Sequence, residues 1–113
     1  MTSIKKLIDK QREFDERHAG NLPFYSVINE DNLPELEHLI VCLVGEVGEF
    51  SNLVKKVRRG DFPLAVAKQE LDEELADVFI YLLKIAGQFG VDLEREYEKK
   101  MNKNEQKFKR YER

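Results

Sequence analysis

The sequence predicts an all-α fold of four helices in one domain, residues 1–113, and three observations support that prediction. Only three prolines and six glycines interrupt the chain. Charged residues make up 36% of it, and most of them are helix formers. Apolar residues recur at helical spacing in four separate segments. Because a chain of this size buries only a modest core, we also expect an oligomer that hides more apolar surface.

The first helix is predicted over residues 3–17, and a loop is predicted over residues 18–33. Thr2 or Ser3 can cap the start of the helix. The loop is rich in glycine, asparagine and proline, which form turns. Phe24 and Tyr25 lie inside it, and they either plug the loop onto the core or line a binding loop. The apolar spacing of the helix follows Ile4, Leu7, Ile8, Gln11 and Phe14.

Three further helices are predicted, separated by two short connections. The second begins near Asn32 and ends at Gly60, the third follows Pro63, and Asp92 can cap the fourth. Short connections imply antiparallel neighbours, so the second and third helices should lie side by side. Their apolar stripes consist of Leu36, Leu39, Leu43, Val47, Phe50, Val54 and Val57, and of Leu64, Ala67, Leu71, Leu75, Val78, Leu82 and Ile85.

Two acidic pairs lie in these neighbouring helices. Glu46 and Glu49 are three positions apart, and so are Glu74 and Asp77. That spacing points both side chains of a pair to one face of a helix. Like charges so placed repel, more strongly when they lose water, and two such pairs facing each other require a cation between them. Oxygen ligands of this kind hold a hard divalent cation such as Mg2+.

Gly45 and Gly48 surround the first acidic pair. Each glycine costs a helix interior roughly 1 kcal/mol relative to alanine, so two in one turn indicate a special role. Either the helix packs closely against a neighbour, or the glycines leave room for a ligand beside the carboxylates. Taken alone, each acidic pair is also compatible with an ordinary solvated face.

The fourth predicted helix carries cations on one face. Asn104 occupies a stripe position where an apolar residue was due, and a buried amide costs free energy unless it is hydrogen-bonded. Lys100 and Lys107 share its face. These three residues can clamp phosphate oxygens. The alternative is an ordinary solvated basic tail.

Charge and hydropathy exclude several other classes of protein. The formal net charge of −3 argues against wholesale binding to duplex nucleic acid or to an acidic membrane. The N-terminus lacks the apolar core of a signal peptide, and no apolar run approaches the roughly 18 residues of a membrane span. We therefore expect a soluble cytoplasmic protein. The single cysteine, Cys42, is expected to be a buried reduced thiol.

A di-iron carboxylate site is a weaker alternative. Glu35 and His38 form one Glu-x-x-His element, but a di-iron bundle needs two of them. The other histidine, His18, follows Asp15 by three positions outside the main helices. His38 is therefore interpreted as an ordinary helix residue.

Three segments together resemble a known family. Gly-Glu-Val-Gly-Glu-Phe spans residues 45–50, Asp-Glu-Glu-Leu-Ala-Asp-Val spans residues 72–78, and Lys-Met-Asn-Lys-Asn ends at Asn104. In this order they resemble the signature of the MazG-like all-α nucleoside triphosphate pyrophosphohydrolases. The resemblance covers residues 36–107, with Lys107 standing where an arginine is common.

The resemblance implies a four-helix bundle that is completed or enlarged by assembly into homodimers or homotetramers. It implies Mg2+, with Mn2+ as a substitute, held by Glu46, Glu49, Glu74 and Asp77. The expected substrate is a nucleoside triphosphate rather than a nucleic acid polymer. Water attacks between the α and β phosphates and gives a nucleoside monophosphate and pyrophosphate, a reaction that can clean the nucleotide pool.

Roles for individual residues follow from the same resemblance. Glu49 is the expected catalytic residue, which orients or deprotonates the attacking water. Lys100, Asn104 and Lys107 are expected to bind the substrate phosphates, and Phe24 and Tyr25 the base. The rival hypothesis is a non-catalytic helical module that binds a nucleotide or a partner helix.

Overall fold

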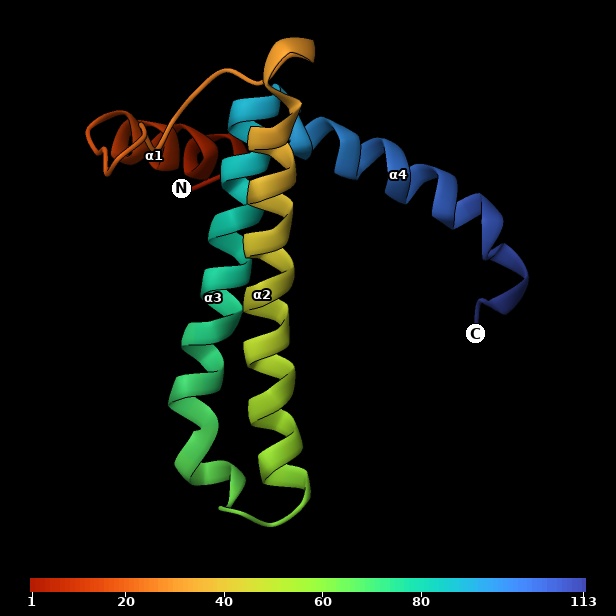
Figure 1. Cartoon of the computed structure of the whole chain (residues 1–113). Coiled ribbons are helices and arrows are strands. Elements are labelled where there is room, and N and C mark those ends of the chain that lie inside the picture. Colours follow the sequence, from red (N-terminus) through yellow and green to blue (C-terminus); the bar gives the residue numbers. More distant parts are fainter.

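The computed structural model describes all 113 residues, and all of its regular elements are helical (Figure 1). The four main helices are α1 (Ile4–Glu16), α2 (Leu33–Arg58), α3 (Leu64–Phe89) and α4 (Leu93–Lys107). Single 3-10 turns span Glu30–Asn32 and Lys109–Tyr111. The predicted all-α fold with four helices is thus confirmed. None of these helices is both long enough and apolar enough to cross a membrane.

Local sequence signals set several of the helix ends. The Ser3 side chain accepts a hydrogen bond from the Lys6 backbone N–H, and Asp92 accepts one from the Arg95 N–H. These bonds satisfy backbone donors that the first turn of a helix leaves free. At the C-terminal end of α3, Gly90 has a φ of 75°, a left-handed conformation that glycine adopts without a steric penalty.

Helices α2 and α3 form a long antiparallel hairpin, as the short connection predicted (Figure 1). At the end near the connection, Leu53 of α2 packs with Ala67 and Leu71 of α3. Helix α1 crosses the other end of α3. There Gly87 lies close to Ile8, because a Cβ built on Gly87 would lie 3.3 Å from the Ile8 Cγ2 atom.

The predicted apolar stripes are only partly buried. Val47 and Leu75 are 48% and 56% exposed, although each lies in a stripe that was expected to face the core. The physical reason is geometrical: one neighbouring helix covers only one side of a stripe, and α1 covers only one end of α3. A long apolar face of the hairpin is therefore left without a partner in the single chain.

Helix α4 extends away from the α2–α3 hairpin (Figure 1). It also contacts α1. The chain is correspondingly open, with a radius of gyration of 17.4 Å, where about 13 Å is typical of a compact chain of this length. Its accessible surface is 9100 Å², against about 6,500 Å² for an ordinary monomer of this mass. The single chain is thus less compact than an ordinary monomer of its length.

Candidate metal centre

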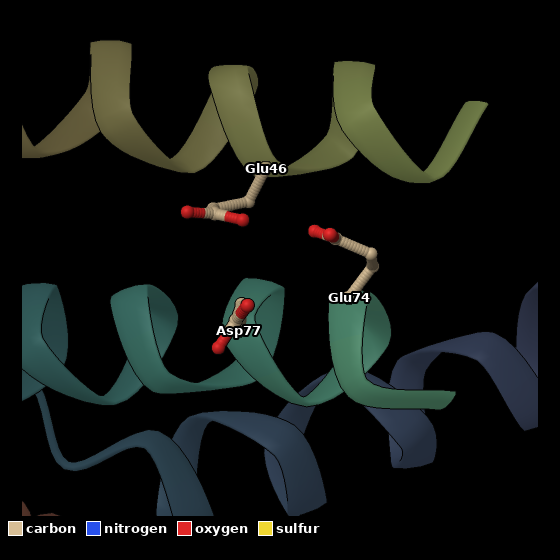
Figure 2. A group of neighbouring side chains, drawn as sticks. All are labelled: Glu46, Glu74 and Asp77. Atoms are coloured by element: carbon tan, nitrogen blue, oxygen red, sulfur yellow. The ribbon is translucent and has the colours of Figure 1, made fainter. Parts of the chain in front are cut away.

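Three carboxylates meet in the space between α2 and α3 (Figure 2). Glu46 extends from α2, and Glu74 and Asp77 extend from successive turns of α3. One ligand oxygen of each residue lies within 4.8 Å of the others. The antiparallel pairing of the helices places the two acidic motifs opposite each other, and the three-residue spacing turns Glu74 and Asp77 to the same side.

No protein cation compensates these charges. None of the ion pairs in the chain involves the three residues. Glu46 Oε2 and Glu74 Oε2 are both buried and have no hydrogen-bond partner. Burial, followed by the neighbouring Glu49 and Glu46 carboxylates, raises the pKa of Glu74 to about 7 from its ordinary 4.5. Burial and the charges of Glu49 and Asp77 also raise the pKa of Glu46.

This donor set fits a hard divalent cation. All of the donors are carboxylate oxygens, which is the preference of Mg2+, and two of them are oxygens that nothing in the protein satisfies. A cation among them would supply the missing partner and remove the repulsion that raises the pKa values of Glu46 and Glu74.

Glu49, the fourth predicted ligand, lies at the edge of this cluster. Its carboxylate is near enough to raise the pKa values of both Glu46 and Glu74. Its side chain also lines an open groove of about 440 Å³ along α2, whose other lining residues are Gly45, Gly48, Ser51, Asn52 and Lys55. Glu49 is therefore close to the carboxylate cluster and open to solvent, as Asp77 of the cluster also is.

The two glycines of α2 line that groove rather than a helix contact. A Cβ built on Gly45 or on Gly48 would meet no atom within 4 Å. Of the two roles expected for them, close packing against a helix of the same chain is thus wrong, because the space beside them is open. The groove offers this space to a ligand or to a second chain.

The predicted phosphate-binding residues are not brought to the carboxylates within one chain. Lys100, Asn104 and Lys107 all lie on α4, which extends away from the hairpin (Figure 1). Asn104 is half-buried, and the Lys107 Nζ lies 5.3 Å from the centre of the Phe108 ring. These cations can meet an acidic cluster only if α4 moves or if the cluster belongs to another chain.

The predicted base-binding residues lie in the loop that follows α1. Phe24 is 43% exposed, and its ring stacks on His18 with 5.9 Å between ring centres. The Arg12 guanidinium lies 5.0 Å from the centre of the Tyr25 ring. The Lys84 Nζ lies 5.4 Å from the centre of the Phe24 ring, and Lys84 follows Asp77 by two turns of α3, about 10 Å along its axis.

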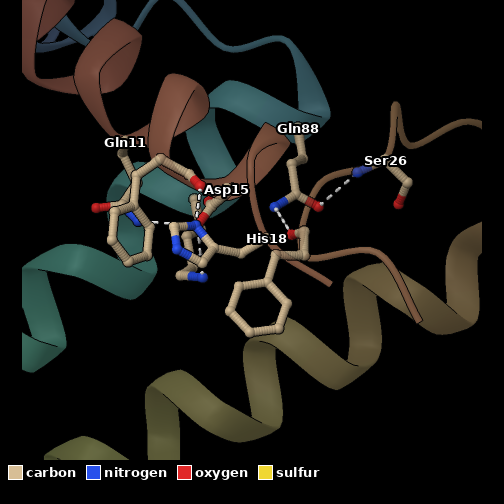
Figure 3. Close-up of polar contacts among 8 residues, drawn as sticks. Gln11, Asp15, His18, Ser26 and Gln88 are labelled. Atoms are coloured by element: carbon tan, nitrogen blue, oxygen red, sulfur yellow. Dashed lines mark hydrogen bonds and ion pairs between the residues drawn. The ribbon is translucent and has the colours of Figure 1, made fainter. Parts of the chain in front are cut away.

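A buried ion pair that the sequence analysis did not identify joins α1 to α3 (Figure 3). Asp15 is 1% exposed, and its Oδ1 accepts hydrogen bonds from Gln11 Nε2 and from Lys84 Nζ, both at 3.0 Å. The signal in the sequence was Lys84 itself, an isolated cation in the apolar run of residues 78–86. A charge in such a run must find a partner.

Gln88 fixes the aromatic loop onto α3 in the same region (Figure 3). Its side chain is 4% exposed, donates to the Phe24 backbone carbonyl at 3.1 Å and accepts from the Ser26 backbone N–H at 3.5 Å. The Ile28 N–H also bonds to the Gln88 backbone carbonyl at 2.9 Å. The position of Phe24 is therefore set by α3, the helix that carries two of the clustered acids.

Comparisons with known proteins agree with this geometry. Residues 31–113 match the model of the MazG-like family. The chain is 41% identical to dCTP pyrophosphatase 1 of Rattus norvegicus and 40% identical to that of Mus musculus, over 63% of this chain and 44% of each relative. It is 33% identical to the Gene 37 protein of Mycobacterium phage L5, over 65% of this chain and 66% of that protein.

The chain spans less than half the length of the dCTP pyrophosphatases that it matches. No solved structure matches it significantly. The family match nevertheless covers α2, α3 and α4, and so includes all of the acidic motifs and the basic face of α4. This chain therefore belongs to the MazG-like family.

Proposed function

We propose that this chain is a single-domain, Mg2+-dependent nucleotide pyrophosphohydrolase. Its substrate is a (d)NTP, cleaved between the α and β phosphates to (d)NMP and pyrophosphate, as a step of nucleotide-pool housecleaning. The observation that carries the proposal is the cluster of Glu46, Glu74 and Asp77, with two buried oxygens that lack a partner. Membership of the MazG-like family and similarity to proteins named dCTP pyrophosphatase support the reaction type.

The four acidic residues at this centre have two roles, metal binding and activation of the attacking water. Glu46, Glu74 and Asp77 hold Mg2+, or Mn2+ in its place, with Glu49 as a further oxygen ligand. When bound, the cation polarises phosphoryl oxygens and neutralises charge on the triphosphate. Glu49 is the catalytic residue: from the open side of the cluster its carboxylate orients the attacking water and accepts its proton. The exposed groove beside Glu49 gives that water and the substrate access.

In this proposal the basic face of α4 in one chain lies beside the carboxylate cluster of a second chain. Lys100, Asn104 and Lys107 bind phosphate oxygens and offset the negative charge that develops on the pyrophosphate leaving group. A homodimer or homotetramer brings them together with the cluster, while covering the apolar face of the hairpin. The excess accessible surface of the single chain supports this assembly.

Phe24 and Tyr25 contact the base. Phe24 is partly exposed and so offers aromatic surface to a base, and aromatic stacking on a base contributes about 1–3 kcal/mol. Because Gln88 and the Ser26 backbone fix the loop on α3, the ring is held at a set distance from the cation. A fixed distance between the Phe24 ring and the cation favours substrates in which the base and the triphosphate are separated by that same distance.

The decisive experiment measures pyrophosphate release from a panel of nucleotides with Mg2+, beginning with dCTP because of the similar proteins. We expect turnover by the natural chain and its loss in Glu49→Gln and Asp77→Asn. Glu73→Gln is the matched control, because Glu73 is exposed on α3 and its Oε1 contacts only Gln69. It should keep full activity.

Calorimetry with Mg2+ and a nucleotide separates the enzyme from a non-catalytic module. Binding without product by the natural chain, together with unchanged binding in both acid-to-amide variants, would overturn the proposal. Binding that weakens in Asp77→Asn while Glu49→Gln still binds nucleotide but forms no product would support both assigned roles.

A further inference from the structure

The groove along α2 adjoins the proposed reaction centre and contains an unpaired cation. Glu49, which lies close to the carboxylate cluster, lines it together with Asn52 and Lys55. Both Asn52 and Lys55 are exposed, and Lys55 takes part in none of the ion pairs of the chain. The groove therefore offers an amide and an ammonium group, both hydrogen-bond donors, to a ligand that reaches Glu49.

The lining of this groove suits a phosphate better than a second protein chain. None of its lining residues is hydrophobic, whereas the core of a protein–protein interface is mostly apolar. The chain has an apolar surface of that kind elsewhere, because Leu75, Phe79 and Leu82 line a separate open groove on α3. A lysine ammonium binds phosphate oxygens as a point charge on a flexible stem.

Along the hairpin, the carboxylate cluster lies between this cation and the aromatic loop. Lys55 follows Glu49 by six residues, about 9 Å along α2 towards its C-terminal end. Phe24 lies in the other direction, since its ring is beside Lys84, which follows Asp77 towards the C-terminal end of α3. Because α2 and α3 are antiparallel, these two directions are opposite (Figure 1).

We propose that Lys55, assisted by Asn52, binds the β and γ phosphates of the substrate, the part that leaves as pyrophosphate. In a nucleoside triphosphate the base and the terminal phosphates extend in opposite directions from the α phosphorus. With the base at Phe24 and the cation at the carboxylate cluster, the terminal phosphates extend along α2 towards Lys55.

This inference rests on the proposed function and adds to it a phosphate-binding lysine from the same chain as the acids. The lysines of α4 would come from a second chain, whereas Lys55 shares its helix with Glu49. Its ammonium group offsets the negative charge on the leaving pyrophosphate, so its loss should lower kcat as well as raise KM.

Isothermal calorimetry with inorganic pyrophosphate and excess Mg2+ tests this subsite without turnover. In Lys55→Met the affinity for pyrophosphate should fall by at least about tenfold, because a hydrogen bond between charged groups is lost. The affinity for dCMP, which has no β or γ phosphate, should stay unchanged. Lys55→Arg should keep most of the affinity for pyrophosphate, because arginine also binds phosphate oxygens.

Lys56→Met is the matched control. Lys56 also lies in the last turn of α2, so the variant loses the same charge at the same helix end, but Lys56 does not line the groove. Its affinity for pyrophosphate should equal that of the natural chain. The proposal would be overturned by equal losses in the two methionine variants, by an unchanged affinity in Lys55→Met, or by an equal loss for dCMP.

Binding and turnover together separate this subsite from the proposed reaction. If pyrophosphate binding depended on Lys55 but no nucleotide were hydrolysed, the proposed reaction would fail and the subsite would stand. If a nucleotide were hydrolysed with the same kcat and KM in Lys55→Met as in the natural chain, the reaction would stand and the subsite would fail.

Discussion

The contacts of α3 with α1 and with α2 both contain buried acid, but they treat its charge differently. At the α1 contact, Asp15 is 1% exposed and paired with Lys84 at 3.0 Å. In the α2 contact, Glu46 and Glu74 are buried at one oxygen each with no cation near them. Asp15 also has one unpartnered oxygen, Oδ2, but its charge is cancelled within the chain. Only the second region is left with uncompensated charge.

The difference separates a structural role from a binding role. A buried charge that its own chain neutralises joins helices together, and removing its partner destabilises the fold. A group of like charges that the chain does not neutralise destabilises the metal-free protein. Such a group is expected where a cation from solution binds. On these grounds the Asp15–Lys84 pair holds α1 on α3, and the carboxylate cluster has the charge pattern expected of the proposed cation site.

The largest expected effect is on catalysis in Glu74→Gln. Removing one charged ligand should lower kcat/KM by at least about a thousandfold, roughly 4 kcal/mol of transition-state stabilisation. The same change should raise the urea midpoint of the metal-free protein, because it removes repulsion within the cluster. Full activity, or a lower midpoint, would contradict the binding role of this region.

The next effect is on stability in Lys84→Met, which keeps the aliphatic stem and removes the charge. Leaving the buried Asp15 carboxylate without its cation should cost about 3 kcal/mol of unfolding free energy in urea titrations. Lys68→Met is the matched control on the same helix, since its ion pair with Asp72 is exposed at the surface. It should cost less than about 1 kcal/mol. Equal losses in the two variants would remove the distinction between the pairs.

The third effect is the pH dependence of the metal-free protein. Between the ordinary pKa of 4.5 and the folded value of about 7, the folded state holds more protons on Glu74 than the unfolded state does. The stabilising contribution of this group is complete below pH 4.5 and is lost as the pH rises through 7. With EDTA, thermal midpoints should therefore contain a falling component across this range, smaller in Glu74→Gln.

Saturating Mg2+ should cancel this component, because the cation binds the ionised carboxylates. The affinity for Mg2+ should accordingly increase as the pH rises towards and past 7, where protons no longer compete at Glu74. Isothermal calorimetry at several pH values measures this trend. An affinity that does not change with pH would place the Mg2+ elsewhere.

The smallest effect compares two glycines. Gly48→Ala should stabilise the single chain by about 0.5–1 kcal/mol, since the space beside Gly48 is open and alanine favours a helix. Gly87→Ala should gain less, because its new Cβ would lie 3.3 Å from Ile8 Cγ2. Thermal unfolding at low protein concentration measures both. If Gly48→Ala also lowers activity or assembly, the groove is filled by substrate or by a second chain.

Local signals in the sequence predicted much of this fold. Ser3 and Asp92 cap the helices where they were expected to, and the turn after Arg58 returns α3 beside α2. The meeting of Glu46 with Glu74 and Asp77 was also predictable, because a three-residue spacing and an antiparallel pairing together determine which side chains face each other.

Other features depend on contacts that spacing does not encode. The apolar stripe of α2 includes Val47, yet nothing in a periodic pattern says how many neighbours will cover it. The direction of α4 depends on the short connection after Gly90, so the placement of Lys100 and Lys107 relative to the acids could not be predicted. The pairing of Asp15 with Lys84 joins residues 69 positions apart.

The outward course of α4 has a genetic consequence under the proposed assembly. Each reaction centre would combine acids from one polypeptide with lysines from another. The effect of a mutation would therefore depend on which two chains assemble. A mutant chain would inactivate centres that it shares with a normal chain, which is a dominant-negative effect. Conversely, two alleles crippled at different helices could together restore some function that neither supplies alone.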